Sequence, residues 1–186
     1  VGYDALYANT TGSLNVAVGA YALDAATTAT ANTAVGIYAL SSSTTGSENV
    51  AIGRQSLFSN TTANDNISIG VNAMYANTTG KRNVSVGSGA LGANTTADNN
   101  TAVGYLALYD NTTGTYNTAV GAYALTNNTT ASYNTAFGYN SLGTNTTGNT
   151  LTAFGYDALA ANTTGDENAA FGQNSLKANT TGEYNT

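Results

Sequence analysis

The sequence predicts an all-β fold, a parallel β-solenoid in which eleven 17-residue turns stack into a rod. Three observations predict it. One unit recurs from Val1 without insertion or deletion, glycine occupies the second position of every copy, and no apolar stripe of helical spacing appears. A strict short repeat is the signature of stacked units that bury a continuous core between neighbours.

The repeat has the consensus V-G-x-x-A-L-x-x-N-T-T-G-x-x-N-T-A, and we number its columns 1 to 17 from Val1. Column 1 is Val, Ile or Phe, column 6 is Leu except for Met74, columns 10 and 11 are Thr, and column 15 is Asn except for Leu151. Columns 16 and 1 lie two residues apart and would share a face of a short strand. We therefore expect them to point inward as a pair, with column 6 filling the interior from another side.

The corners of each turn are expected at the Gly-rich and Asn-rich columns, where positive φ values are needed. Such a turn has a thin core, so its stability has to come from the stacking of neighbouring turns. At about 4.8 Å per turn, the rod would be roughly 50 Å long. The Asn of column 15 is expected to form an amide ladder. Of the two Thr, one is expected to point inward and one outward.

The charged and aromatic residues avoid the near-invariant columns. All charges fall in columns 3, 4, 7, 8, 13 or 14, and all thirteen Tyr fall in columns 3, 4, 7 or 14. These variable columns should therefore face water or a partner. Two oppositely charged pairs lie one repeat apart, Asp65 with Arg82 and Lys81 with Asp98. We expect both to be vertical neighbours, worth at most a few tenths of a kcal/mol when exposed.

The residue inventory argues against catalysis, so we expect no enzyme. Without His or Cys, no nucleophilic triad based on either residue can form. The closest acidic cluster, Asp166, Glu167 and Glu183, is interpreted as a solvated patch, because a calcium site needs six or more convergent oxygens. No cofactor-binding or metal-binding residue is predicted.

Partners of two kinds are also excluded. The net charge is −6, and no apolar run approaches the ~20 residues that cross a bilayer. Nucleic acid is not an expected partner, because only four basic residues could meet phosphates, namely Arg54, Lys81, Arg82 and Lys177.

The repeated Asn and Thr leave two alternatives open. Asn-Thr-Thr is a formal N-glycosylation signal, although we favour roles for these residues in corners and ladders. The Thr ladders also suggest an alternative function, ice binding or adsorption to a surface. Adjacent residues of a strand point to opposite faces, so Thr-Thr would expose one row of Thr side chains, whereas Thr-x-Thr exposes two. The nine Asn-Thr-Thr signals start at Asn9, Asn60, Asn77, Asn94, Asn111, Asn128, Asn145, Asn162 and Asn179.

The segment 100–114, N-T-A-V-G-Y-L-A-L-Y-D-N-T-T-G, resembles two related groups of repeats. One group forms the heads of trimeric autotransporter adhesins. The other lies upstream of endosialidase-type chaperone domains in phage tail fibres and bacterial surface fibres. The resemblance covers the whole chain but not the unit length, since adhesin heads use shorter repeats. It implies a left-handed coil, a homotrimer, a position on a cell or virion surface, and adhesion.

We expect residues 1–186 to be a single repeat domain, a segment of a longer fibrous protein, since the chain starts mid-unit and both ends look like interior repeats. The leading interpretation is a fibre or adhesin-head segment that forms an extracellular rod. The expected partners are further copies of the chain, as a homotrimer or an end-to-end filament. A surface glycan or another cell-surface target would bind the outward columns, where the Tyr could stack on sugars.

Overall fold

The computed structural model describes all 186 residues and contains ten three-residue strands in one sheet. It has no helix, and so none that could cross a membrane. Each strand covers columns 16, 17 and 1, and therefore joins two consecutive copies of the repeat. The strands are β1 (Val16–Val18), β2 (Thr33–Val35), β3 (Val50–Ile52), β4 (Ile67–Ile69), β5 (Val84–Val86), β6 (Thr101–Val103), β7 (Thr118–Val120), β8 (Thr135–Phe137), β9 (Thr152–Phe154) and β10 (Ala169–Phe171).

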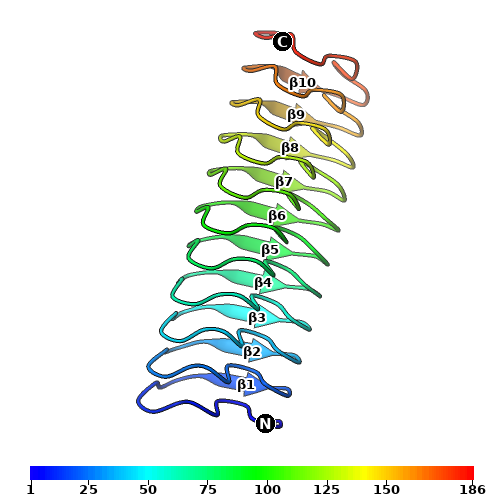
Figure 1. Ribbon diagram of the computed structural model, residues 1–186. Helices are drawn as coiled ribbons and strands as arrows, with labels where there is room; N and C mark the ends of the chain where they lie inside the picture. The colour runs from blue at the N-terminus through cyan, green and yellow to red at the C-terminus, as the bar shows by residue number, and fades with distance from the viewer.

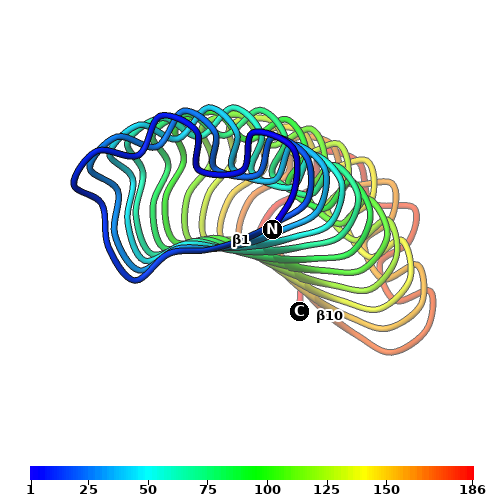
Figure 2. The ribbon, with the colours of Figure 1, turned by 90° about the horizontal axis from the view of Figure 1, so that it is seen from below.

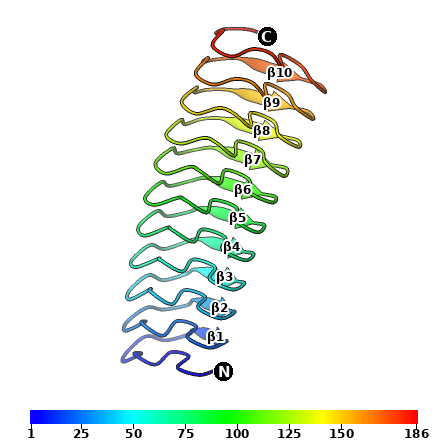
Figure 3. The same ribbon diagram turned by 45° about the vertical axis from the view of Figure 1, so that its right-hand side comes forward.

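The strands stack in chain order from β1 to β10, and every neighbouring pair is parallel. The register is one full repeat, so that Val16 lies beside Thr33 and Val18 beside Val35. The sheet follows one side of the rod, with the two termini at opposite ends (Figures 1 and 3). The parallel β-solenoid predicted from the 17-residue repeat is therefore confirmed.

Seen along the rod, each turn is a flattened loop with one straight and one wavy side (Figure 2). The strands form the straight side. The chain then returns along the wavy side through successive tight turns, as when the Asn60 N–H donates to the Leu57 carbonyl at 3.2 Å. Each turn is rotated slightly against the last, as expected for the twist of stacked strands (Figure 2).

The middle residue of every strand points inward, and its two neighbours point outward. Column 17, which is Ala or Ser, is buried in all ten strands, whereas Val16 and Val18 are 50% and 43% exposed. The expectation that columns 16 and 1 form the inward pair is thus wrong. The reason is the flatness of the turn, because the small residues of columns 5 and 17 already fill the interior around the column 6 side chains.

Two Asn ladders line the interior on either side of column 12. In the predicted column 15 ladder, the Asn83 side-chain amide donates to Asn66 Oδ1 at 3.2 Å and to the Ala97 carbonyl at 2.8 Å. Column 9 forms a second ladder, in which Asn94 Nδ2 donates to Asn77 Oδ1 at 2.8 Å and to the same carbonyl at 3.1 Å. Buried amides therefore hold the turns together alongside the apolar core.

Positive φ values occur at more columns than the expected corners. Every Gly of column 2 has φ between 114° and 152°, as predicted for a Gly corner. The Asn of columns 9 and 15 do not, whereas columns 4, 6 and 14 do, including Leu57 at 51°. A left-handed Leu costs roughly 1–2 kcal/mol. Stacking imposes this conformation, because the Leu57 N–H then donates to the Ala73 carbonyl of the next turn at 3.0 Å.

Candidate functional site

The outward side chains of the ten strands form a continuous surface, which we call the flat face. It consists of columns 16 and 1, two parallel rows of Val, Ile, Thr, Phe and Ala with no charged residue. Because the strands stack in register about 4.8 Å apart, the flat face runs roughly 45 Å along the rod. β-branched residues suit such a pleated surface, which explains how so regular a sheet forms from three-residue strands.

The flat face leaves large apolar side chains open to solvent. Near its C-terminal end the exposed Phe rings stack, with 5.5 Å between the centroids of Phe137 and Phe154 and again between Phe154 and Phe171. Monomeric soluble proteins rarely expose contiguous apolar patches above a few hundred Å². The flat face is therefore a candidate for a covered surface. Its exposed members are Val16, Val18, Ile52, Ile67, Ile69, Phe137, Phe154 and Phe171.

Polar and aromatic side chains border the flat face along both edges. Column 14 contributes Glu48 and Arg82 on one edge, and column 3 contributes Arg54 and Tyr139 on the other, all of them exposed. An apolar centre with a polar rim is the usual anatomy of a protein–protein interface, in which charged residues are depleted from the core.

A stripe of aromatic rings, which we call the aromatic stripe, follows columns 3, 4 and 7 of the rod. Neighbouring rings make edge-on or stacked contacts, with centroids 4.9 to 6.1 Å apart. Partial burial, followed by the nearby Tyr3, raises the pKa of Tyr21 above its usual value. The stripe has two segments, Tyr3, Tyr21, Tyr38, Phe58, Tyr75 and Tyr105, Tyr123, Tyr139, Tyr156.

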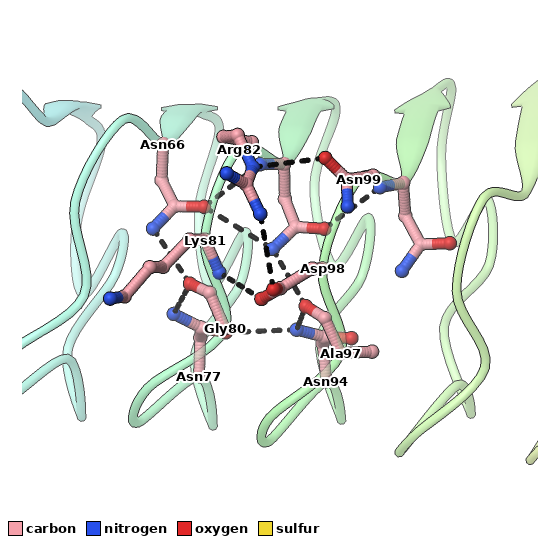
Figure 4. A network of polar contacts seen from close by, with 11 residues as sticks. Asn66, Asn77, Gly80, Lys81, Arg82, Asn94, Ala97, Asp98 and Asn99 are labelled. Atoms are coloured by element: carbon pink, nitrogen blue, oxygen red, sulfur yellow. Dashed lines mark hydrogen bonds and ion pairs between the residues drawn. The ribbon is translucent and has the colours of Figure 1, made fainter.

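Neither of the two expected vertical charge pairs forms a side-chain ion pair, and a diagonal pair forms in their place (Figure 4). Arg82 forms an ion pair with Asp98 at 3.4 Å, while its Nε donates to Asn99 Oδ1 at 3.0 Å. Lys81 does lie below Asp98, but its backbone N–H makes the contact, at 2.7 Å. Asp65 and Arg82 are vertical neighbours, as expected, but they form no ion pair. The long arginine side chain reaches two acceptors in the next copy. Because Arg82 and Asp98 are both accessible to solvent, their ion pair contributes little to stability.

One charged pair is better shielded than the sequence predicts for its columns. Asp157 is only 7% exposed, and its carboxylate accepts from Lys177 Nζ at 2.6 Å and from Asn140 Nδ2 at 2.7 Å. The hydrogen bond from Lys177, with that from Asn140, lowers the pKa of Asp157 below its usual value. The same contact with Asp157 raises the pKa of Lys177. This pair links the tenth and eleventh copies.

The acidic residues of the C-terminal end do not converge. Asp166 Oδ1 accepts the Asn149 backbone N–H at 2.6 Å, so its carboxylate stabilises the stack. No group of three or more His, Cys, Asp or Glu side chains lies close enough to hold a metal ion. Asp166, Glu167 and Glu183 do not form such a group.

The Asn-Thr-Thr segments serve the stack. Seven of the nine Asn, from Asn60 to Asn162, are fully buried and donate through Nδ2 to column 12 carbonyls. A glycan attached at Nδ2 is incompatible with that position. The column 10 hydroxyls donate to the carbonyl of the next column 10 residue, as from Thr78 to Thr95 at 3.0 Å. Column 11 is exposed in every copy. The expectation that one Thr points inward is wrong, because both Thr lie at a corner of the turn. The column 11 hydroxyls form no hydrogen bond within the chain.

Comparison with protein-family models, curated proteins and solved structures gives no match for this chain. Its function has to be inferred from its own surfaces, above all the flat face and the aromatic stripe.

Proposed function

We propose that this chain is a structural rod and not an enzyme, a segment of an extracellular fibre or adhesin head that self-associates through the flat face. Three copies would pack their flat faces around a common axis as a homotrimer. The variable columns, with the aromatic stripe, would then face outward for attachment. The observation that carries the proposal is the flat face itself, an uncharged and largely apolar sheet surface that runs the length of the rod.

A second copy of the chain is the occupant that this surface fits best. The net charge of −6 lies entirely outside columns 16, 17 and 1, so two flat faces can meet without like-charge repulsion in the contact. Both partners would repeat at the same spacing, so one side-chain arrangement could recur at every level of the rod. Closed symmetry is the usual outcome for copies of one chain.

The energy available is sufficient for an oligomer. Covering a Val or Ile that is about 40% exposed contributes roughly 0.8 kcal/mol. Over the twenty outward side chains, several of them Thr, this amounts to roughly 10 kcal/mol for each face. Association costs roughly 4–15 kcal/mol, so the flat face has to be covered along most of its length.

Light scattering on charged variants tests this proposal. Ile69→Lys with Val103→Lys adds two charges to the centre of the flat face, where a monomer would tolerate them in water. We expect a trimeric mass for the unmodified chain and a monomeric mass for this variant, with the far-UV circular dichroism spectrum unchanged. Thr79→Lys with Thr113→Lys, in the same two copies but on the exposed column 11, should remain trimeric. An unmodified chain that is monomeric, or a flat-face variant of unchanged mass, would contradict the proposal.

Adsorption to ice or a comparable surface is the second candidate. It is favoured by the eleven exposed Thr of column 11, whose hydroxyls form no hydrogen bond within the chain and repeat with the turns. They form a single rank at a corner. Measurable thermal hysteresis, lost when several of these Thr are changed to Lys, would support this candidate over the rod.

A further inference from the structure

The aromatic stripe is interrupted once within the rod, at the sixth copy. Columns 3, 4 and 7 of that copy hold Ser88, Gly89 and Gly92, whereas the copies below and above present Tyr75 and Tyr105. The missing side chains leave a pocket of about 420 Å³ that opens on the variable columns. This volume lies at the small end of the range for ligand sites in proteins.

The two glycines shape the floor of this pocket and are buried. A Cβ at Gly92 would lie 2.6 Å from Cε2 of Tyr109, and a Cβ at Gly89 would lie 2.6 Å from Cδ2 of Leu106. The absence of side chains thus lets the ring of Tyr109 and the side chain of Leu106 settle over the sixth copy. Tyr75 lines the pocket from the fifth copy and Tyr105 from the seventh. A ligand here would lie among three tyrosine rings.

The polar groups of the pocket are amides and hydroxyls. Asn72 lines it, and its Oδ1 is buried without a hydrogen-bond partner. Gln55 Oε1 accepts from Arg54 at 2.6 Å, which leaves its Nε2 as a donor. Ser88 donates its hydroxyl to the Val71 carbonyl at 3.3 Å and can still accept. No charged residue lines the pocket.

We infer that this pocket binds one neutral sugar ring, such as a terminal pyranose of a surface glycan. The negative faces of tyrosine rings attract the weakly positive C–H groups on the apolar face of a sugar. Uncharged amides and hydroxyls match its hydroxyl groups. An anionic ligand is disfavoured, because the pocket has no cation and the chain carries a net charge of −6. The inference rests on the proposal that the variable columns face outward, and it adds one specific attachment point for each chain.

Saturation-transfer-difference NMR on the intact chain is a suitable test. The probes are the methyl pyranosides of glucose, galactose, mannose and N-acetylglucosamine. For a ligand of this size, ordinary ligand efficiency gives a dissociation constant of about 1 mM. At least one probe should bind with that affinity and receive its strongest transfer on the ring protons that face tyrosine. No saturable binding by any of the four probes would overturn the inference.

Ser88→Tyr localises the site. Tyr already occurs in column 3 of four other copies, at positions 3, 105, 139 and 156, so the fold accepts it. The new ring would fill the pocket and weaken binding at least tenfold. Ala20→Tyr, the same change of column 3 in the second copy, should bind as the unmodified chain does. Asn72→Ala, which keeps the pocket open and removes the amide, should weaken binding several-fold.

Two outcomes on these variants would overturn the site. One is equal binding by Ser88→Tyr and the unmodified chain. The other is equal loss in Ser88→Tyr and Ala20→Tyr. Because the charged flat-face variant retains the pocket, measuring sugar binding on it separates a failure of this inference from a failure of self-association.

Discussion

Gly104→Ala tests how closely neighbouring turns approach at column 2. A Cβ at Gly104 would lie 2.6 Å from both the carbonyl carbon and the oxygen of Gly121 and 3.0 Å from the nitrogen of Ala122. These are backbone atoms fixed by the stack, since the Gly121 N–H donates to the Val103 carbonyl at 2.8 Å. The methyl group can be accommodated only by separating two turns. Overpacking of this kind typically costs about 1–3 kcal/mol.

The backbone conformation adds a second cost, because φ at Gly104 is +138°, a region that L-residues avoid. Strain of this type is worth about 1–3 kcal/mol. We therefore expect Gly104→Ala to destabilise the chain by about 4 kcal/mol, the sum of the two costs. Urea unfolding followed by far-UV circular dichroism would show this as a large fall in midpoint. A break at one interface divides a stacked rod, so the transition should also broaden.

Two further glycines separate the contributions. Gly172 has φ +114°, and a Cβ added there would meet nothing within 4 Å, so Gly172→Ala retains only the conformational cost. A Cβ at Gly92 would lie 2.6 Å from the movable ring of Tyr109 and 3.0 Å from the Gly89 carbonyl oxygen, so Gly92→Ala should cost about 1 kcal/mol, the low end for overpacking. Unfolding of Gly104→Ala at the midpoint of the unmodified chain would refute the close-stacking account.

Three other changes probe the interior. Asn94→Ala should cost about 2–4 kcal/mol in urea unfolding, because buried amide groups of the column 9 ladder lose their partners. Ala119→Val should cost about 1–3 kcal/mol by overpacking, while Thr118→Val on the flat face should be nearly neutral. Burial raises the pKa of Asp24 in the folded chain above its value in the unfolded chain. Ionisation of Asp24 therefore lowers stability as the pH rises from the unfolded-state pKa through the folded-state pKa. Asp24→Asn should therefore raise Tm at pH 7 and lose this advantage in acid.

Each of these results can contradict its premise. A ladder variant as stable as the unmodified chain would mean that column 9 amides add nothing to the stack. Equal effects of the two valine substitutions would mean that column 17 is not the inward position. A pH-independent gain for Asp24→Asn would remove ionisation as the cause.

The stack itself follows from the sequence, because a 17-residue period fixes which residues become neighbours in adjacent turns. The orientation of the strands does not. Period-two alternation shows that columns 16 and 1 share a face of the strand. It does not show whether that face or the opposite one is buried, and the more hydrophobic face is normally the buried one. Here hydrophobicity pointed the wrong way, because the outward face is apolar and the inward residue is Ala or Ser. An apolar outward face is what we expect of a surface that other copies of the chain cover.

The pocket escapes sequence-based prediction for a different reason. Its walls come from copies four, five and seven and its floor from copy six, so it exists only once the turns are stacked. A signal was present, since the sixth copy alone has no side chain larger than Ser at columns 3, 4 and 7. The choice of Asp98 over Asp65 by Arg82 carried no such signal, because a long exposed side chain selects its partner from local geometry.

The self-association of the flat face is tested most directly by sedimentation equilibrium of the unmodified chain across a dilution series. A closed homotrimer predicts a mass three times the 18.7 kDa of the chain, constant over the concentrations at which the trimer persists. A mass that increases without limit would indicate a filament in place of a closed assembly. A mass of 18.7 kDa at every concentration would contradict the account, because the apolar flat face would then be stable in water uncovered.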